Sequence, residues 1–372
     1  METCLTYKTV APFLSMARAQ NAATSAMMPC VDRLAARRKA PSDTALHGDD
    51  LGMKLRFALL AILPALPMAA AANDSTAQLG AGGLELVRND TIEILSEDLY
   101  VSADEVRVAY RFRNRTDAPV TYLVAFPLPT IDAIVPEVMN IVLPDAESDN
   151  FMDFRVTVDG RAVTPKLEAR VIALGLDQTE VVQRLGLALN PMDFDLYQWL
   201  QTAPPATKEE LNRLGLATVD PYTTQAVWKL ETTFYWEQTF PPGKEVAVEH
   251  SYRPITGFGF FGDWVFSEPV YQEKYCIDAS FEAAARKKLA AVTDPNNPYL
   301  NEKRVSYILT TANNWSGPIK DFRLVVDKGS PDALVSFCGT NVKKISPTQF
   351  EMRAKDFVPE RELEILIAAP VE

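Results

Sequence analysis

The sequence predicts a mainly β protein with two antiparallel β-sandwich domains, the first of which carries a helical insertion. Three observations support this fold class. Short segments alternate strictly between apolar and polar residues, as half-buried strands do. Turn residues separate these segments at frequent intervals. Helical periodicity, in contrast, is concentrated in residues 173–220 and in one later segment.

The first predicted strands surround a turn that is rich in Asn, Asp and Pro. Residues 104–114 (DEVRVAYRFRN) place valines and aromatic rings on one face and arginines on the other. The turn NRTDAP follows, and residues 120–129 (VTYLVAFPLP) return as a second strand. We therefore expect these segments to pair as a hairpin. Two further hairpins are predicted, one over 154–165 around the turn Asp159-Gly160 and one that pairs 226–238 with 244–254.

The hydrophobic period changes between the second and the third hairpin. Residues 177–189 (DQTEVVQRLGLAL) and 207–218 (TKEELNRLGLAT) have helical spacing, and each contains a glycine suited to end a helix. Thr207 and Glu210 have the spacing of a capping box. Residues 173–220 are therefore predicted to be a helical insertion in a first sandwich over 74–255.

The remainder of the chain, residues 256–372, is predicted to form the second sandwich. A helix-like segment over 279–292 precedes several short strand patterns that are separated by turn residues. This part contains Cys276 and Cys338, the only cysteines after residue 30. No CxxC spacing suggests a redox pair and two cysteines are too few for a metal site, so we predict a structural disulfide.

Residues 53–72 have the three parts of a secretion signal. Lys54 and Arg56 precede an apolar run of 16 residues that starts at Phe57, and three alanines end at Ala72. As a helix the run would rise about 24 Å, short of the ~30 Å hydrocarbon core of a membrane. We therefore predict cleavage between Ala72 and Asn73, or one residue earlier, and a periplasmic or secreted protein with no membrane span in its mature chain.

Residues 1–52 lack hydrophobic periodicity. Three interpretations remain open for them: a start codon assigned too far upstream, a disordered leader, or an arginine-rich organelle-targeting peptide. The acidic residues Asp49 and Asp50 disfavour targeting. Without residues 1–72 the chain has 300 residues with 29 basic and 44 acidic side chains, a formal charge of −15. Such a charge repels phosphate, so no nucleic-acid partner is predicted.

The chain after residue 72 contains one histidine, His250. It has the same parity as Val246 and Val248 in an alternating segment, so we expect it on the buried side of a strand. One histidine excludes a multi-histidine metal centre, and no cofactor or metal is predicted. The carboxylates of residues 145–153 (DAESDNFMD) are spaced as in a calcium loop, but the loop glycine and final glutamate are missing, so an exposed acidic loop is expected.

The segment GFGFFGDWVF supplies the candidate binding residues Phe258, Phe260 and Trp264. Exposed, these rings would form a shelf for a glycan or a partner strand. The alternative, which we favour because large aromatic side chains are usually buried, is that they pack between the two sandwiches.

Three phrases carry a family resemblance: residues 77–114, VAFPLP at 124–129, and NNWSGPIKDFRLVVDK at 313–328. They resemble a bacterial family of secreted proteins with a domain of unknown function numbered four-four-two-four, from Asn73 to about Pro370. The resemblance implies no catalytic residues. Residues 106–129 and 163–173 are also similar to the vault protein inter-alpha-trypsin domain, a β-sandwich of adhesion and matrix-associated proteins. The Asp-x-Ser-x-Ser metal motif is missing, so metal-dependent adhesion is not implied.

These observations predict an exported, non-catalytic envelope protein that binds another protein or a surface polymer such as a glycan. The alternative is a carboxylate-dependent hydrolase of carbohydrate or cell-wall material. A cleft with two facing carboxylates would favour the hydrolase. A flat aromatic patch or an open sheet edge would favour binding.

Overall fold

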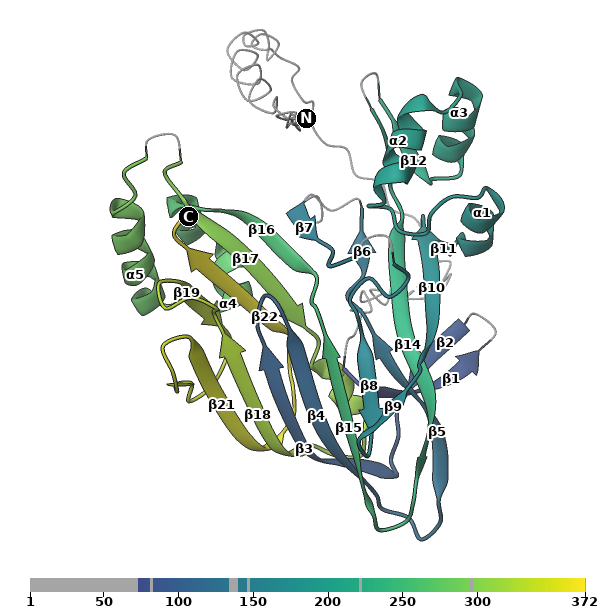
Figure 1. The fold of residues 1–372 in the computed structure, drawn as a ribbon, viewed down its shortest axis with the longest axis vertical. Coiled ribbons are helices and arrows are strands. Elements are labelled where there is room, and N and C mark those ends of the chain that lie inside the picture. Colours follow the sequence, from purple (N-terminus) through teal and green to yellow (C-terminus); the bar gives the residue numbers. More distant parts are fainter. Residues whose placement is uncertain are drawn as a thin grey trace, which may run out of the picture. The chain divides into compact units, whose positions relative to one another are not determined.

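The computed structural model describes residues 73–80, 83–133, 140–145, 148–220, 223–294 and 297–371. Slightly fewer than half of these residues lie in β-strands, and the strands belong to one compact unit (Figure 1). The predicted leader and signal peptide, residues 1–72, lie outside the described residues. Within the described part of the chain, no helix is both long and apolar enough to cross a membrane.

The largest sheet has eight strands, and its strands alternate between buried and exposed side chains as the sequence predicts. In β4, for example, Val106, Val108 and Tyr110 are buried while Arg107 and Arg111 are exposed. All neighbouring pairs are antiparallel except β18 with β3. The order across the sheet is β20 (Lys343–Lys344), β21 (Gln349–Phe357), β18 (Ile319–Asp327), β3 (Ile92–Val101), β4 (Val106–Asn114), β15 (Glu245–Tyr252), β8 (Arg155–Val158) and β9 (Arg161–Val163).

A seven-stranded sheet shares the main core with this sheet. Phe126 and Phe234 of the seven-stranded sheet stack on Phe154, with ring centroids 4.8 Å and 4.6 Å from that of Phe154. Stacked rings at such distances stabilise a core beyond the area they bury. The order is β11 (Leu176–Asp177), β10 (Lys166–Ala173), β14 (Lys229–Phe240), β5 (Val120–Pro127), β1 (Ser75–Gly80) and β2 (Gly83–Val87), with β6 (Ile131–Asp132) also paired to β14.

A five-stranded sheet completes the main β structure. One of its faces contributes to the main core, and the other carries a smaller core beneath helices α4 (Pro269–Tyr275) and α5 (Ala279–Ala290). The α5 segment agrees with the predicted helix. The strand order is β19 (Leu334–Phe337), β22 (Leu363–Ala369), β17 (Leu300–Tyr307), β16 (Thr256–Phe261) and β7 (Ile141–Val142).

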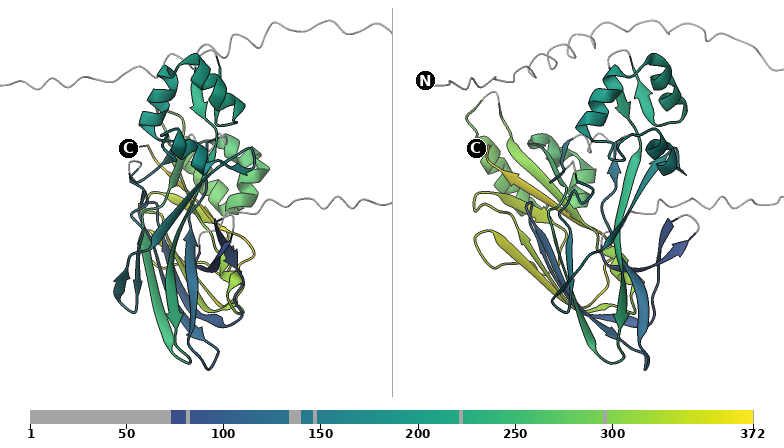
Figure 2. Two further views of the ribbon diagram at one scale, coloured as in Figure 1. Left: turned by 90° about the vertical axis from the view of Figure 1, so that its right-hand side faces the viewer. Right: turned by 45° about the vertical axis from the view of Figure 1, so that its right-hand side comes forward.

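Three helices and a two-stranded sheet of β12 (Ala217–Val219) and β13 (Thr224–Ala226) follow β10 and β11. The helices α1 (Thr179–Arg184), α2 (Phe194–Thr202) and α3 (Pro205–Arg213) gather at one end of β10 and β14 (Figures 1 and 2). Gly186 and Gly215, just past α1 and α3, have φ of +68° and +70°, as helix-ending glycines do. The capping box was wrong, because α3 begins at Pro205 and Thr207 lies inside it.

Two of the three predicted hairpins are wrong. The turn at Asp159-Gly160 does join a hairpin, β8 with β9. In contrast, β4 and β5 belong to different sheets, as do β14 and β15. The side-chain amide of Asn114 donates to Ala118 O, between β4 and β5, and to Phe240 O, at the end of β14. It therefore joins the two connections that pass from one sheet to the other, β4–β5 and β14–β15. Alternation shows that each strand buries one face, but two strands can satisfy it by packing face to face instead of edge to edge.

The arrangement of two separate sandwiches over 74–255 and 256–372 is not confirmed. Strands β18, β20 and β21 lie in the same sheet as β3, β4, β8, β9 and β15. The parallel pair β18–β3 joins residues more than 220 positions apart, for example Arg323 with Asp98. Because the hydrogen bonds between β18 and β3 cross the expected domain boundary, both halves of the chain contribute strands to the same sheet.

Candidate functional site

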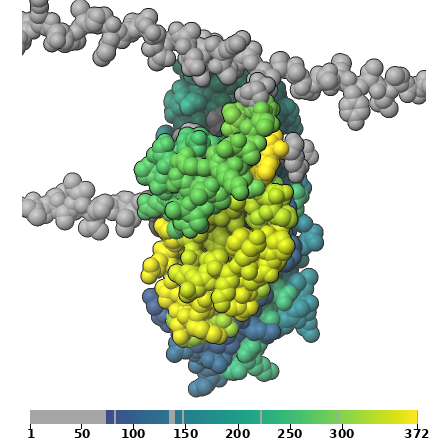
Figure 3. Space-filling model, turned by 90° about the vertical axis from the view of Figure 1, so that its left-hand side faces the viewer, coloured from purple at the N-terminus to yellow at the C-terminus, as the bar shows by residue number. Residues whose placement is uncertain are grey.

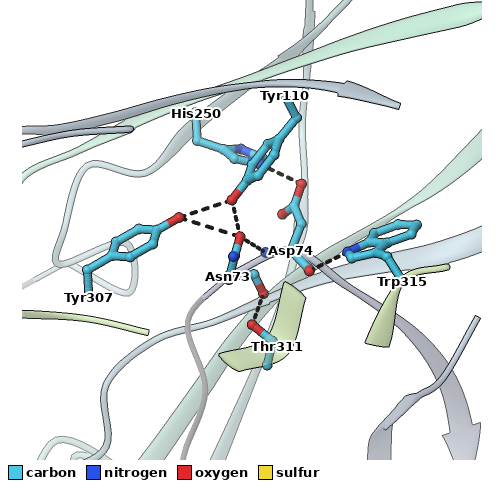
Figure 4. A network of polar contacts seen from close by, with 7 residues as sticks. All are labelled: Asn73, Asp74, Tyr110, His250, Tyr307, Thr311 and Trp315. Carbon is cyan, nitrogen blue, oxygen red and sulfur yellow. Dashed lines mark hydrogen bonds and ion pairs between the residues drawn. The ribbon is translucent and has the colours of Figure 1, made fainter. Parts of the chain in front are cut away.

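A cluster of buried polar residues lies where the first described residues enter the main core. Figure 4 shows all of its members except Glu97. The cluster is unusual because it concentrates titratable groups in a region otherwise filled by apolar side chains. Its members are at most 5% exposed: Asn73, Asp74, Glu97, Tyr110, His250, Tyr307, Thr311 and Trp315.

Strand register brings these side chains together. Tyr110 and His250 face inward by the alternation of β4 and β15, as predicted for His250. Glu97 faces inward because the register of β3 shifts between Ile94 and Ser96, which reverses the parity of the buried positions. In the sheet, Glu97 lies opposite Tyr110 on one side and Phe322 on the other.

Asn73 forms hydrogen bonds with several elements of the core, as acceptor and as donor. The Tyr110 hydroxyl donates to Asn73 Oδ1 and lies 3.0 Å from the Tyr307 hydroxyl. Thr311 Oγ1 donates to the carbonyl of Asn73 at 3.0 Å. The residue at the predicted cleavage site is therefore tied to β4, to β17 and to the segment after β17 (Figure 4).

Asp74 is held on both its backbone and its side chain. Trp315 Nε1 donates to the Asp74 carbonyl at 2.6 Å, and His250 Nε2 lies 2.9 Å from Asp74 Oδ2. The side chains of His250 and Asp74 are fully buried. Aromatic rings enclose the imidazole, with Phe154 stacked on it at 5.2 Å between centroids.

Four atoms of the cluster make no hydrogen bond of ordinary geometry within the described part of the chain: both carboxylate oxygens of Glu97, Asp74 Oδ1 and His250 Nδ1. Burial raises the pKa of Glu97 to about 8; the Asn73 amide opposes this rise and the Asp74 charge adds to it. Burial, followed by the charge of Glu97, raises the pKa of Tyr110 and Tyr307 well above the usual value.

A carboxylic acid, two phenols and a histidine–carboxylate pair have the chemistry for acid–base catalysis. A catalytic group must nevertheless touch its substrate, and here every group is enclosed by the core. The hydrogen bonds converge on the backbone and side chains of Asn73 and Asp74, so the geometry fits an anchor for these two residues, which precede β1.

The predicted binding residues behave differently from our favoured expectation. Phe258, Phe260 and Trp264 are 45%, 60% and 48% exposed, so the interpretation that they pack in a core is wrong. Phe261 takes the buried position instead and is fully enclosed beneath the α4–α5 helices. The alternation of β16 places Phe258 and Phe260 on the face opposite Phe261.

The three exposed rings do not form one shelf. Register places Phe258 opposite Lys303 and Phe260 opposite Asn301, on one face of the five-stranded sheet. Trp264 instead contacts Tyr271, whose hydroxyl donates to Glu302 on the other face. Only Phe258 and Phe260 therefore share a surface.

The outer edge of β16 is open beside these two rings. The neighbouring strand β7 pairs with Thr256 and Gly257 only. From Phe258 to Phe261, no strand among the described residues pairs with this edge. We refer to the free edge with Phe258 and Phe260 as the β16 edge.

A second exposed aromatic surface was missed by the sequence analysis. Helix α2 presents Phe194, Tyr197 and Trp199, which are 70%, 42% and 39% exposed. Phe194 and Tyr197 border a pocket of about 240 Å³ that Met192 also lines. The aromatic spacing of residues 194–199 is the available signal; it lies within the predicted helical insertion but between its two predicted helices.

A groove on the solvent face of the eight-stranded sheet has a volume of about 600 Å³. Three arginines line it, and each is paired: Arg107 with Glu105, Arg155 with Asp153, and Arg323 with Asp98. These pairs leave the groove without a free concentration of positive charge for an anion.

Cys276 and Cys338 form a disulfide with 5.0 Å between their Cα atoms, as predicted. The bond connects the end of α4 to the segment after β19, which places the green helical region beside the yellow C-terminal strands in Figure 3.

Two residues of the acidic segment 145–153, at 146 and 147, lie outside the described residues. In the described part of the chain, no group of three or more His, Cys, Asp or Glu side chains could hold a metal ion.

Fold and cluster together define a β-rich domain in which strands from distant parts of the chain enclose Asn73 and Asp74. Residues 72–366 match the family model of the Domain of unknown function (DUF4424), so the chain belongs to this family. Comparison with curated proteins gave no significant match. The similarity to the vault protein inter-alpha-trypsin domain stays a prediction.

Solved structures similar to the chain include a proposed nutrient binding protein from Legionella pneumophila. That protein is 16% identical, with a TM-score of 0.39, and the match covers 80% of this chain and 71% of the other. An M1 zinc metallopeptidase from Deinococcus radiodurans is 10% identical, with a TM-score of 0.24; the match covers 76% of this chain and 43% of the peptidase. Neither similarity is close enough to transfer an activity.

Proposed function

We propose that the protein is exported to the periplasm or the cell exterior, where it binds another protein without catalysing a reaction. The β16 edge carries this proposal. An extended segment of the partner would pair with the free backbone of Phe258–Phe261 and pack against the two exposed rings. The secretion-signal pattern and the disulfide support the compartment, because disulfides persist in oxidising environments.

Two physical arguments favour a binding edge. Proteins usually protect exposed strand edges with charged side chains, prolines or covering loops, because a free edge pairs with other chains. This edge instead carries two phenylalanines, which supply apolar contacts for a partner strand. Lys303 and Asn301 are exposed opposite them and provide a polar border.

An extended peptide fits this surface better than a glycan does. Free backbone N–H and C=O groups recur along a strand at the spacing of another polypeptide backbone, and a sugar chain does not reproduce that spacing. The hydrolase alternative gains no support from the geometry, because the carboxylates of Asp74 and Glu97 lie in the core, where a polymer cannot reach them.

The test is site-specific photo-crosslinking in producing cells, with the crosslinker at Lys303. The native protein should give a discrete protein adduct, and the double variant F258T/F260T should lose it. Threonine keeps the strand propensity of both positions. The matched control is Phe194→Thr on the other aromatic surface, which should retain the adduct. An adduct that persists in F258T/F260T, or one made of carbohydrate, would contradict the proposal.

A further inference from the structure

The most unusual group in the molecule is the carboxylate of Glu97. It is 1% exposed, and neither oxygen has a hydrogen-bond partner of ordinary geometry among the described residues. Buried carboxylates are normally paired with a cation or with several donors. The structure therefore provides a buried anionic site whose natural partner is a positive charge.

The groups around Glu97 do not supply that charge. Tyr110 and Tyr307 face it with neutral phenols, and Asp74 adds a second negative charge. His250 is already bonded to Asp74. The Asn73 amide is the remaining polar neighbour, and it acts on Glu97 without satisfying either oxygen.

Asn73 is also the residue at which the mature chain is predicted to begin. The family match starts at residue 72, one residue before it. Signal cleavage here converts a neutral backbone amide into an α-ammonium group. Asn73 and Asp74 are completely buried, so the new terminus would be created inside the cluster.

We propose that the α-ammonium group of the mature N-terminus is the missing partner of Glu97, so that removal of the signal peptide completes the core. The inference rests on the predicted cleavage and is independent of the binding function proposed above. Until cleavage, Asp74 is bonded to His250 but Glu97 has no cation of its own. After cleavage, an internal ion pair fixes Asn73, which precedes β1, in the core.

The first test measures the reactivity of the N-terminus in the mature protein. A chain that starts at Asn73 can be released from a fusion by a protease that leaves a native terminus. Near pH 7 an acylating reagent prefers the α-amine over lysines, because its pKa is lower. We expect the native protein to resist labelling at Asn73 at least tenfold relative to the urea-unfolded protein. Equal labelling rates in the two states would overturn the proposal.

The second test separates the ion pair from general effects of the terminus. Several extra residues ahead of Asn73 should lower the melting temperature of the native sequence but not of Glu97→Gln, which has no charge to pair. The matched control Glu302→Gln alters another buried acid, which pairs with Arg304, and should leave the effect of the extension unchanged. If the extra residues lower the melting temperature of the Glu97→Gln protein as much as that of the native sequence, the proposed ion pair is contradicted. If Glu97→Gln does not fold, the labelling result decides.

Discussion

The pH dependence of stability provides a sharp test of the environment around Glu97. In a chain with uncleaved residues ahead of Asn73, burial holds the pKa of Glu97 at about 8, against the usual value of 4.5 for a glutamate. The folded state therefore binds a proton that the unfolded state releases between these values. Stability should fall as the pH rises through this window.

The magnitude follows from the size of the shift. Each pKa unit corresponds to about 1.4 kcal/mol, so the difference between 4.5 and about 8 costs about 5 kcal/mol once Glu97 is fully ionised. At pH 7 about 70% of this cost is present. The free energy of unfolding should thus lose up to about 1.4 kcal/mol per pH unit from this residue alone.

Urea unfolding at pH 5, 6, 7 and 8 measures this slope directly. Glu97→Gln in the extended chain removes the titrating group and should flatten the profile, so that the variant gains stability relative to the parent as the pH rises. In the chain that starts at Asn73 the substitution should instead destabilise, because it removes the partner of the α-ammonium. Identical slopes in parent and variant would refute the assignment.

Three further predictions concern stability. Replacing Cys276 and Cys338 with serine opens a link between residues 62 positions apart, and the chain-entropy model predicts a loss of about 4 kcal/mol in urea unfolding; an unchanged midpoint would contradict a structural role. Trp264→Ala should change stability by about 0.5 kcal/mol or less in thermal unfolding, because the side chain is half exposed. Trp315→Ala should cost ~3–5 kcal/mol in the same assay, because its buried indole also bonds Asp74, and a melt like that of Trp264→Ala would be inconsistent with this anchor.

Local patterns predicted much of the secondary structure but not the pairing of strands. The alternation of residues 244–254 correctly predicted that His250 faces the core, and the glycines after α1 and α3 were correctly predicted to end these helices. Whether β4 pairs with β5 or packs across from it depends on contacts that alternation does not encode. The same limitation hid the parallel pair β18–β3, which unites the two predicted domains in one sheet.

The candidate site was difficult to predict for a related reason. Glu97 and Ile94 both face the core, although strict alternation would place them on opposite faces of β3. Both are buried because the irregularity near Ser96 reverses the alternation, so that Glu97 faces inward with Leu99. The exposure of Phe258 and Phe260 ran against the general tendency of aromatic residues to be buried, because Phe261 occupies the nearby core position. The disulfide was predictable from an even pair of cysteines after residue 72 in a chain that we expect to be exported.

The proposed function depends on export, and the proposed partner of Glu97 depends on where the mature chain begins. The most direct measurement is the intact mass and N-terminal sequence of the protein recovered from the periplasm or medium of producing cells. We expect a chain that begins at Asn73, or at Ala72, with Cys276 and Cys338 oxidised. A stable cellular product that retains residues 1–52 would contradict it, because no α-ammonium would then form beside Glu97.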